Sequence, residues 1–167
     1  VIGACIAQKT APTNITSVEA NPLLLPVIAH THDINKAGGI TVINAIVGPE
    51  DGSADFHIAE DFWASSLSPD IPNIMQTVRI DTVNVNTLIA ESGANVLVAD
   101  IEGAEFDLFP QIDWTPIDLV IVELHPDMTS FANLGRLFTT LIGAGLIPDI
   151  ANTQRARVMT FKKVSRD

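Results

Sequence analysis

The chain has 167 residues and 47% of them are hydrophobic, so it is long and apolar enough to build the core of one domain. Twenty acidic residues against nine basic ones give a formal charge of −11, which repels phosphate backbones and argues against a nucleic-acid partner. No apolar run approaches the roughly 18 residues that a membrane helix needs, and no secretory signal is visible. Because a lone cysteine cannot form an internal disulfide, we expect a cytoplasmic domain spanning residues 1–167, without a membrane partner.

The N-terminal part of the chain predicts one βαβ unit. Residues 14–20 and 40–48 are expected to be strands. The helix between them is expected to be capped by Asn21 and to end at Gly38–Gly39. The apolar stripe of this helix is formed by Leu24, Val27, Ile28 and Ile34.

The middle of the chain breaks this βα rhythm. Residues 53–59 and 74–80 predict two strands joined by a loop rich in Pro and Ser, which is typical of an antiparallel insertion. Phe62 and Trp63 in that loop are expected either to cover a substrate pocket or to pack against the hairpin. Residues 85–93 then predict a short helix that ends at a glycine.

Strands and helices alternate again in the second half of the chain. Strands are expected at residues 95–100, 117–124, 146–151 and 157–163. Helices are expected at residues 103–109 and 131–145, the second with a Ser130 cap. The apolar face of the second helix is formed by Phe131, Leu134, Phe138 and Ile142. Apolar strands without alternation indicate a parallel sheet covered by helices on both faces. The sequence therefore predicts an α/β protein with a doubly wound sheet, which binds ligands outside the carboxyl ends of its strands.

Two polar side chains end the first two strands. Glu19 can accept hydrogen bonds from both hydroxyls of a ribose, or it is a solvated residue favoured by the dipole of the following helix. Asn44 can both donate to and accept from an adenine edge, or it is a turn residue. Val1–Ala4 is expected to be part of a glycine-bearing turn, in which Gly3 allows a cofactor to approach the backbone closely.

Acid and base groups follow the next two strands. Asp100 and Glu102 are two residues apart, as are Glu123 and His125, so each pair shares one face of an extended chain. If the two strands are neighbours, both pairs face one crevice, where His125 is a proton acceptor near neutral pH. The alternative for His125 is a loop histidine before a proline. Three further residues are expected to have no role in the site: the surface charges Glu105 and Asp107, and the core residue Cys5.

Several stretches together resemble the FkbM family of S-adenosylmethionine-dependent methyltransferases, in order over residues 1–127. They are "VIGA", "SVEANP", "INAIVG", "VADIEGAE" and "IVELHP", of which "DIEGAE" is the most specific. The resemblance implies a class I, Rossmann-like methyltransferase fold, whose mostly parallel sheet of seven strands has an antiparallel last strand. It also implies that the first strand of that fold is missing from this chain.

The resemblance further implies S-adenosylmethionine as cofactor. Its methionine part lies against Gly3 and Ala4, its ribose is held by Glu19 followed by Ala20, its adenine meets Asn44 and Ala45, and Asp100 lies beside the methionine end. Members of this family resemble O-methyltransferases that act on hydroxyls of small molecules, sugars or polyketides. The sequence indicates neither the methyl acceptor nor the oligomeric state.

Methyl transfer to a hydroxyl is helped by a base. We expect His125 or Asp100 to be that base and Glu123 to orient it. No metal site is predicted, although a divalent cation held by Asp100 and Glu102 is a second way to lower the hydroxyl pKa. An NAD-binding oxidoreductase of the Rossmann type, which Glu19 suits equally, and a non-catalytic nucleotide-binding module are the alternatives.

Overall fold

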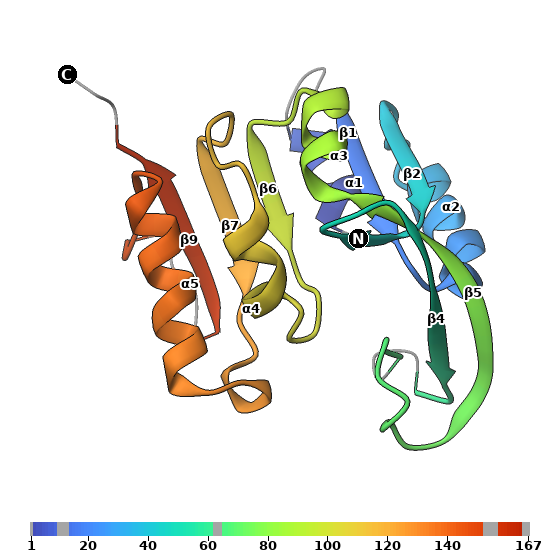
Figure 1. The fold of residues 1–167 in the computed structure, drawn as a ribbon. Helices are drawn as coiled ribbons and strands as arrows, with labels where there is room; N and C mark the ends of the chain where they lie inside the picture. Colours follow the sequence, from blue (N-terminus) through green and yellow to red (C-terminus); the bar gives the residue numbers. More distant parts are fainter. Residues whose placement is uncertain (1, 10–13, 62–64, 152–156, 165–167) are drawn as a thin grey trace. The chain divides into compact units, whose positions relative to one another are not determined.

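The computed structural model describes residues 2–9, 14–61, 65–151 and 157–164 (Figure 1). They divide into two compact units, Val1–Leu88 and Ile89–Asp167, and each is described by itself. A single domain over the whole chain stays a prediction. Among the described helices, none has both the length and the apolar character needed to cross a membrane. Phe62 and Trp63 lie outside the described residues.

The N-terminal unit begins with the expected βαβ unit. Its elements are α1 (Ile2–Lys9), β1 (Ile15–Glu19), the 3₁₀ turn η1 (Pro22–Leu24), α2 (Leu25–Ile34) and β2 (Ile40–Asn44). β1 and β2 pair in parallel, and the register brings Glu19 opposite Asn44 at their carboxyl ends. Two of the predicted polar residues are therefore neighbours.

The helix of this unit differs from the prediction at its end and on its face. Asn21 caps η1 by accepting the Leu23 N–H, but α2 ends at Ile34, before the glycines, because Lys36 already takes a left-handed φ of 52°. Val27 and Ile34 are exposed. Leu24 and Ile28 of the expected stripe are half-buried, and Leu25 and His32 share that half-buried face with them.

The expected strand over residues 40–48 is two strands in two sheets. It breaks at the buried Ala45, whose N–H donates to the Glu19 carbonyl at 3.2 Å. After the break, β3 (Ile46–Gly48) pairs in parallel with β5 (Ile74–Asn84), which pairs with the antiparallel β4 (Gly52–Ala59). This confirms the antiparallel insertion. Its core is formed by Ile46, Phe56, Ile58 and Ile80.

The start of the chain is helical where a glycine-bearing turn was expected. Gly3 and Ala4 lie in the first turn of α1, and Ala4 is buried. A Cβ built on Gly3 would stand 3.7 Å from Ile15 Cγ2 and 3.8 Å from Ile40 Cδ1, which is ordinary contact, so no glycine is required there. Because Ala4 is the buried residue of this turn, the adjacent Cys5 is exposed, and its expected place in the core is wrong.

The C-terminal unit is a mixed four-stranded sheet. α3 (Val85–Ser92) spans the boundary between the units. The other elements are β6 (Val96–Ala99), α4 (Glu105–Leu108), η3 (Phe109–Gln111), β7 (Leu119–Glu123), η4 (Pro126–Met128), α5 (Phe131–Gly143), β8 (Leu146–Pro148) and β9 (Val158–Lys163). The order is β6-β7-β9-β8, with β6 and β7 parallel and β9 antiparallel to both of its neighbours. The antiparallel last strand is thus confirmed, whereas one doubly wound sheet through the whole chain stays a prediction.

α4 and α5 lie side by side on one face of this sheet (Figure 1). Ser130 caps α5 by accepting the Asn133 N–H, as expected. The buried face of α5 consists of Leu137 and Leu141, whereas Phe131 is 90% exposed. Because Leu137 and Leu141 are spaced by one helical turn, they meet the sheet together. The expected face through Phe131 and Ile142 is wrong at both ends.

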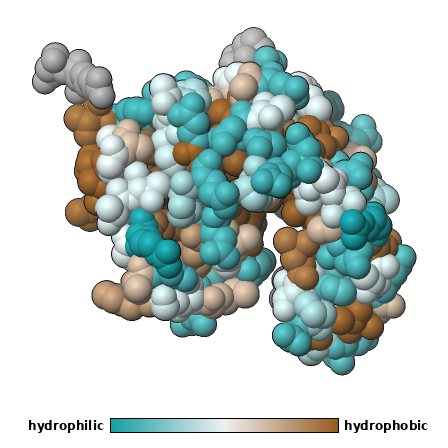
Figure 2. All heavy atoms as spheres, in the orientation of Figure 1, coloured by the Kyte–Doolittle hydropathy of each residue, from teal (hydrophilic) through white to brown (hydrophobic). Residues whose placement is uncertain are grey.

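β7 is buried completely on only one of its faces. Val120 and Val122 are fully buried, while Ile121 between them is half-buried, so the strand alternates and the expectation of uniform burial is wrong here. Hydrophobic side chains also remain at the surface of this unit. Figure 2 shows them gathered over the end of α5 and the neighbouring β8, where Ile142 and Ile147 are exposed.

Candidate functional site

The predicted site residues lie in two groups. Glu19, Ala20, Asn44 and Ala45 belong to the N-terminal unit, as do Gly3 and Ala4. Asp100, Glu123 and His125 belong to the C-terminal unit. Each group is described within its own unit, and the shared role of the two groups in cofactor binding stays a prediction.

The amide of Asn44 joins the ends of β1 and β2. Its Nδ2 donates to the carbonyl oxygens of Glu19, at 2.8 Å, and Ala20, at 3.1 Å. The donor half of this side chain therefore stabilises the strand ends. The expected exchange of two hydrogen bonds with an adenine edge would compete with these contacts. Ala45, expected beside the adenine, is buried directly under the same strand ends.

The carboxylate of Glu19 is held in place at the start of η1. Its Oε1 accepts the backbone N–H of Asn21 at 2.8 Å, and Asn21 itself is buried. This contact orients the carboxylate at the carboxyl end of β1, where a doubly wound fold binds its ligand. The ribose-binding role of Glu19 stays a prediction.

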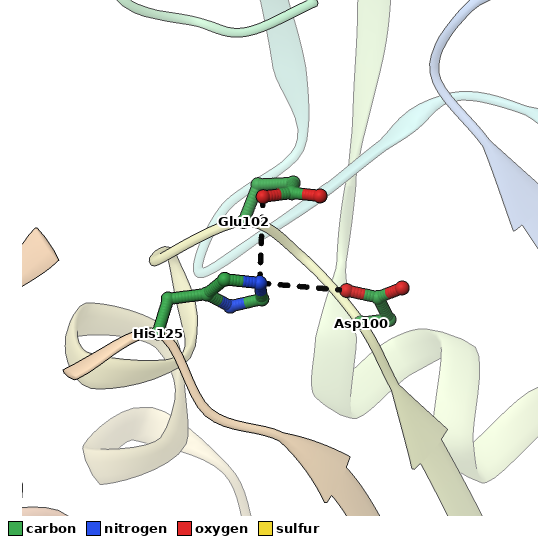
Figure 3. A group of neighbouring side chains, drawn as sticks. All are labelled: Asp100, Glu102 and His125. Carbon is green, nitrogen blue, oxygen red and sulfur yellow. Dashed lines mark ion pairs between the residues drawn. The ribbon is translucent and has the colours of Figure 1, made fainter. Parts of the chain in front are cut away.

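The second group forms a compact cluster at the carboxyl ends of β6 and β7. These strands are parallel neighbours, with Ala99 opposite Val122, so the residues that follow them meet. His125 Nε2 lies 3.4 Å from Glu102 Oε2 and 3.8 Å from Asp100 Oδ1 (Figure 3). The condition that the two strands are neighbours is met, and Asp100, Glu102 and His125 are brought together.

A tight turn places the two acidic residues. The Ala104 N–H donates to the Ile101 carbonyl at 3.1 Å, and between them Glu102 and Gly103 take positive φ angles of 49° and 94°. A left-handed backbone is rare for a residue such as glutamate. It reverses the chain directly after Asp100, so that the carboxylates of Asp100 and Glu102 both lie beside the imidazole.

Glu105 holds this turn and the histidine together. It is 0% exposed, so the expectation that it is a surface charge is wrong. Its Oε2 accepts the Gly103 N–H at 2.9 Å, and its Oε1 accepts the His125 backbone N–H at 2.8 Å and lies 3.2 Å from the ring atom Nδ1. Because a carboxylate only accepts, Nδ1 is the donor in this contact. The one available signal was that Glu105 is the last letter of "DIEGAE".

Glu105, and not Glu123, contacts the His125 ring, and the orienting role expected of Glu123 stays a prediction. Glu123 ends β7, half-buried and opposite Val158 of β9, and its contribution to the cluster is its negative charge. Burial raises the pKa of the Glu102 carboxyl, and the charges of Asp100, Glu123 and Glu105 raise it further, against the opposing effect of His125. Asp107 is exposed, as expected.

This arrangement leaves one ring nitrogen available for chemistry. With the proton of the neutral imidazole on Nδ1, the lone pair of Nε2 points toward Asp100 and Glu102. An acceptor that faces two carboxylates calls for a proton donor or a cation between them. Asp100, Glu102 and His125 each offer one potential ligand atom, all within 4.8 Å of one another. The sequence raised Asp100 and Glu102 as an alternative pair of cation ligands, and the structure adds His125 to them.

Comparison with known proteins extends this description. The methyltransferase FkbM domain matches residues 4–156. The matched range covers both groups of predicted site residues except Gly3. No curated protein and no solved structure matches the chain.

Proposed function

The chain belongs to the FkbM methyltransferase family, and from this premise we propose that it transfers the methyl group of S-adenosylmethionine to a hydroxyl of a small molecule, a sugar or a polyketide. The observation that carries the proposal is the His125 ring. Buried Glu105 holds its Nδ1, and its Nε2 faces Asp100 and Glu102 at the carboxyl ends of two parallel strands.

The reaction is an in-line displacement at the methyl carbon. The acceptor oxygen forms a bond to that carbon, the carbon–sulfur bond breaks, and sulfur keeps the electron pair as the neutral thioether of S-adenosylhomocysteine. The hydroxyl proton passes to Nε2 of His125. Positioning of the two reactants supplies much of the rate, and the base adds a further factor of about 10² to 10⁴.

The carboxylates of the cluster suit both reactants. Asp100 and Glu102 have side chains that are each 50% exposed, so substrate has access to them. Their negative charge favours the sulfonium of the cofactor and the imidazolium that forms when Nε2 takes the proton. Glu105 has the orienting role, because its contact with Nδ1 fixes the tautomer in which Nε2 is the acceptor.

Cofactor recognition is proposed for the N-terminal unit. Glu19 binds the ribose hydroxyls, and Asn44, with Ala20 and Ala45 beside it, borders the adenine. The support is the family match together with the position of Glu19 and Asn44 at paired strand ends. NAD shares the same ribose chemistry, but an FkbM methyltransferase domain favours the sulfonium cofactor over it.

Methyl transfer from radiolabelled S-adenosylmethionine tests the proposal. The chain is incubated with a panel of sugars, polyketides and small alcohols, and mass spectrometry of any product locates the added methyl group. We expect it on oxygen, and we expect His125→Ala to lower the rate at least 100-fold, while His30→Ala, an exposed histidine of α2, leaves it unchanged. Methylation of nitrogen or carbon alone would contradict O-methylation, and full activity of the His125 variant would remove its role as base.

A further inference from the structure

The Asp100, Glu102 and His125 cluster has the composition of a metal site. Two carboxylate oxygens and one imidazole nitrogen lie within 4.8 Å of one another on two adjacent strand ends. Oxygen-only sites suit Mg²⁺ and Ca²⁺, whereas the addition of an imidazole favours first-row transition ions. We propose that these three side chains bind one divalent cation of the Mn²⁺ or Zn²⁺ class.

The separations between the donor atoms fit ligands of one ion better than they fit direct hydrogen bonds. Nε2 lies 3.4 Å from Glu102 Oε2 and 3.8 Å from Asp100 Oδ1. Hydrogen bonds of this kind are about 2.7 to 3.2 Å long. Two ligands that each lie about 2.1 Å from a tetrahedral ion are about 3.4 Å apart. All three atoms lie within 4.8 Å of one another, so rotation of the half-exposed carboxylates toward Nε2 would complete the ligand set.

The burial of His125 and of its partner Glu105 supports the cation site independently of the donor-atom distances. His125 is 8% exposed, and Glu105 is fully buried. Glu105 accepts a hydrogen bond from Nδ1, so that Nε2 is the ring nitrogen that faces the two carboxylates. A carboxylate that holds the far nitrogen of a histidine is the usual support of a metal-binding imidazole. Asp100 and Glu102 are half-exposed, which gives an ion a path from solvent and leaves coordination positions for water or substrate.

The net negative charge of the cluster also supports a bound cation. Asp100, Glu102 and Glu105 surround a single imidazole, and among the described residues no Lys or Arg forms an ion pair with any of the three. A protonated imidazole would neutralise only one of these charges. A divalent cation neutralises two and is attracted by all three.

The cation site stands on this geometry alone, and only its role rests on the proposed function. A cation beside the acceptor hydroxyl lowers the pKa of that hydroxyl. Nε2 is then a ligand, so the hydroxyl proton passes to water rather than to the ring. The proposal thus names what activates the acceptor when metal is present.

Titration of the chelator-treated full chain with Mn²⁺, followed by the electron paramagnetic resonance signal of the free ion, tests the site. We expect one ion bound per chain. The isosteric variants Asp100→Asn and Glu102→Gln should weaken binding at least tenfold, and Glu105→Gln should weaken it by about 10-fold to 100-fold through its hold on His125. The matched control is Asp107→Asn, an exposed carboxylate of α4, which should bind as the unmodified chain does. Zn²⁺ should compete for the site, and Mg²⁺ should compete only at far higher concentration.

The outcomes separate the cation from the methyl transfer. Equal Mn²⁺ binding by the Asp100, Glu102 and Asp107 variants would overturn the proposed ligands. Methyl transfer that persists unchanged in chelator, with no Mn²⁺ bound at millimolar concentration, would overturn the cation site and leave His125 as the base. Tight Mn²⁺ binding that is weakened by the Asp100 and Glu102 substitutions, in a chain that shows no methyl transfer, would keep the cation site and overturn the proposed function.

Discussion

At the scale of single residues, the informative position is the buried carboxylate of Glu105. The sequence predicts Asp100 and His125 as partners, because both follow apolar strands and parallel neighbours end at one edge. It does not predict Glu105, because its burial depends on the direction in which a helix of one turn leaves the strand. Acidic residues in a first helical turn are mostly exposed, and the structure overrides that tendency through three N–H donors.

Removal of this carboxylate should cost substantial stability. Glu105→Ala leaves the His125 N–H and the Nδ1 proton without an acceptor in a buried place, and the Gly103 N–H without one in a partly buried place. We therefore expect the free energy of unfolding to fall by about 3 kcal/mol. Asp107→Ala, two residues on in the same helix but exposed, should change it by less than about 0.5 kcal/mol. Urea unfolding followed by circular dichroism measures both, and equal small losses would show that Glu105 does not hold the turn.

A second residue, Asp113, makes the stability of the folded protein depend on pH. Hydrogen bonds from the side chain and backbone of Thr115 lower the pKa of Asp113 below its usual value. A carboxyl with a depressed pKa in the folded state stabilises the protein above its unfolded pKa and loses that contribution as the pH falls through the folded value. Compared with Asp113→Asn, which keeps an acceptor oxygen, the unmodified chain should be the more stable at pH 7, and the difference in melting temperature should shrink as the pH falls below the ordinary pKa of an aspartate. A difference that does not vary with pH would contradict this role.

At the scale of elements, the sequence predicts which segments are helices and strands better than where they end. The βαβ unit, the antiparallel insertion and the antiparallel last strand are all present as predicted. The errors have two causes. The break at Ala45 and the buried face of α5 depend on which neighbour each segment packs against, and that information is not local. The early end of α2 instead follows from the left-handed backbone of Lys36, which its residue type does not announce.

The turn after β6 is the element on which the cluster depends. A Cβ at Gly103 would stand 3.2 Å from Met128 Cβ, and the φ of 94° disfavours any other residue. Gly103→Ala should therefore lower the free energy of unfolding by about 1 to 2 kcal/mol. Gly135→Ala, in the middle of α5 with no atom within 4 Å of the added Cβ, should instead raise it by up to about 1 kcal/mol. Chemical denaturation of both variants tests the contrast. If Gly103→Ala left the free energy of unfolding unchanged, the turn would be able to rearrange.

At the scale of the whole molecule, composition and order predict the class of fold. Alternating strands and helices predict an α/β protein, and the resemblance to the FkbM family implies an antiparallel last strand, as β9 is to β7 and β8. The hydrogen bonds of the described strands form three sheets. One doubly wound sheet through the whole chain stays a prediction, and the alternation in β7 shows that apolar composition alone does not establish burial.

Calorimetry of cofactor binding to the full chain tests the central claim most directly, because it requires no knowledge of the acceptor. We predict that S-adenosylmethionine and S-adenosylhomocysteine bind with micromolar affinity and NAD does not. Glu19→Gln should weaken binding about tenfold through the lost ribose contacts, while Glu91→Gln, an exposed carboxylate of α3, leaves it unchanged. Binding of NAD in preference to S-adenosylmethionine, or no binding of either at millimolar concentration, would contradict the account.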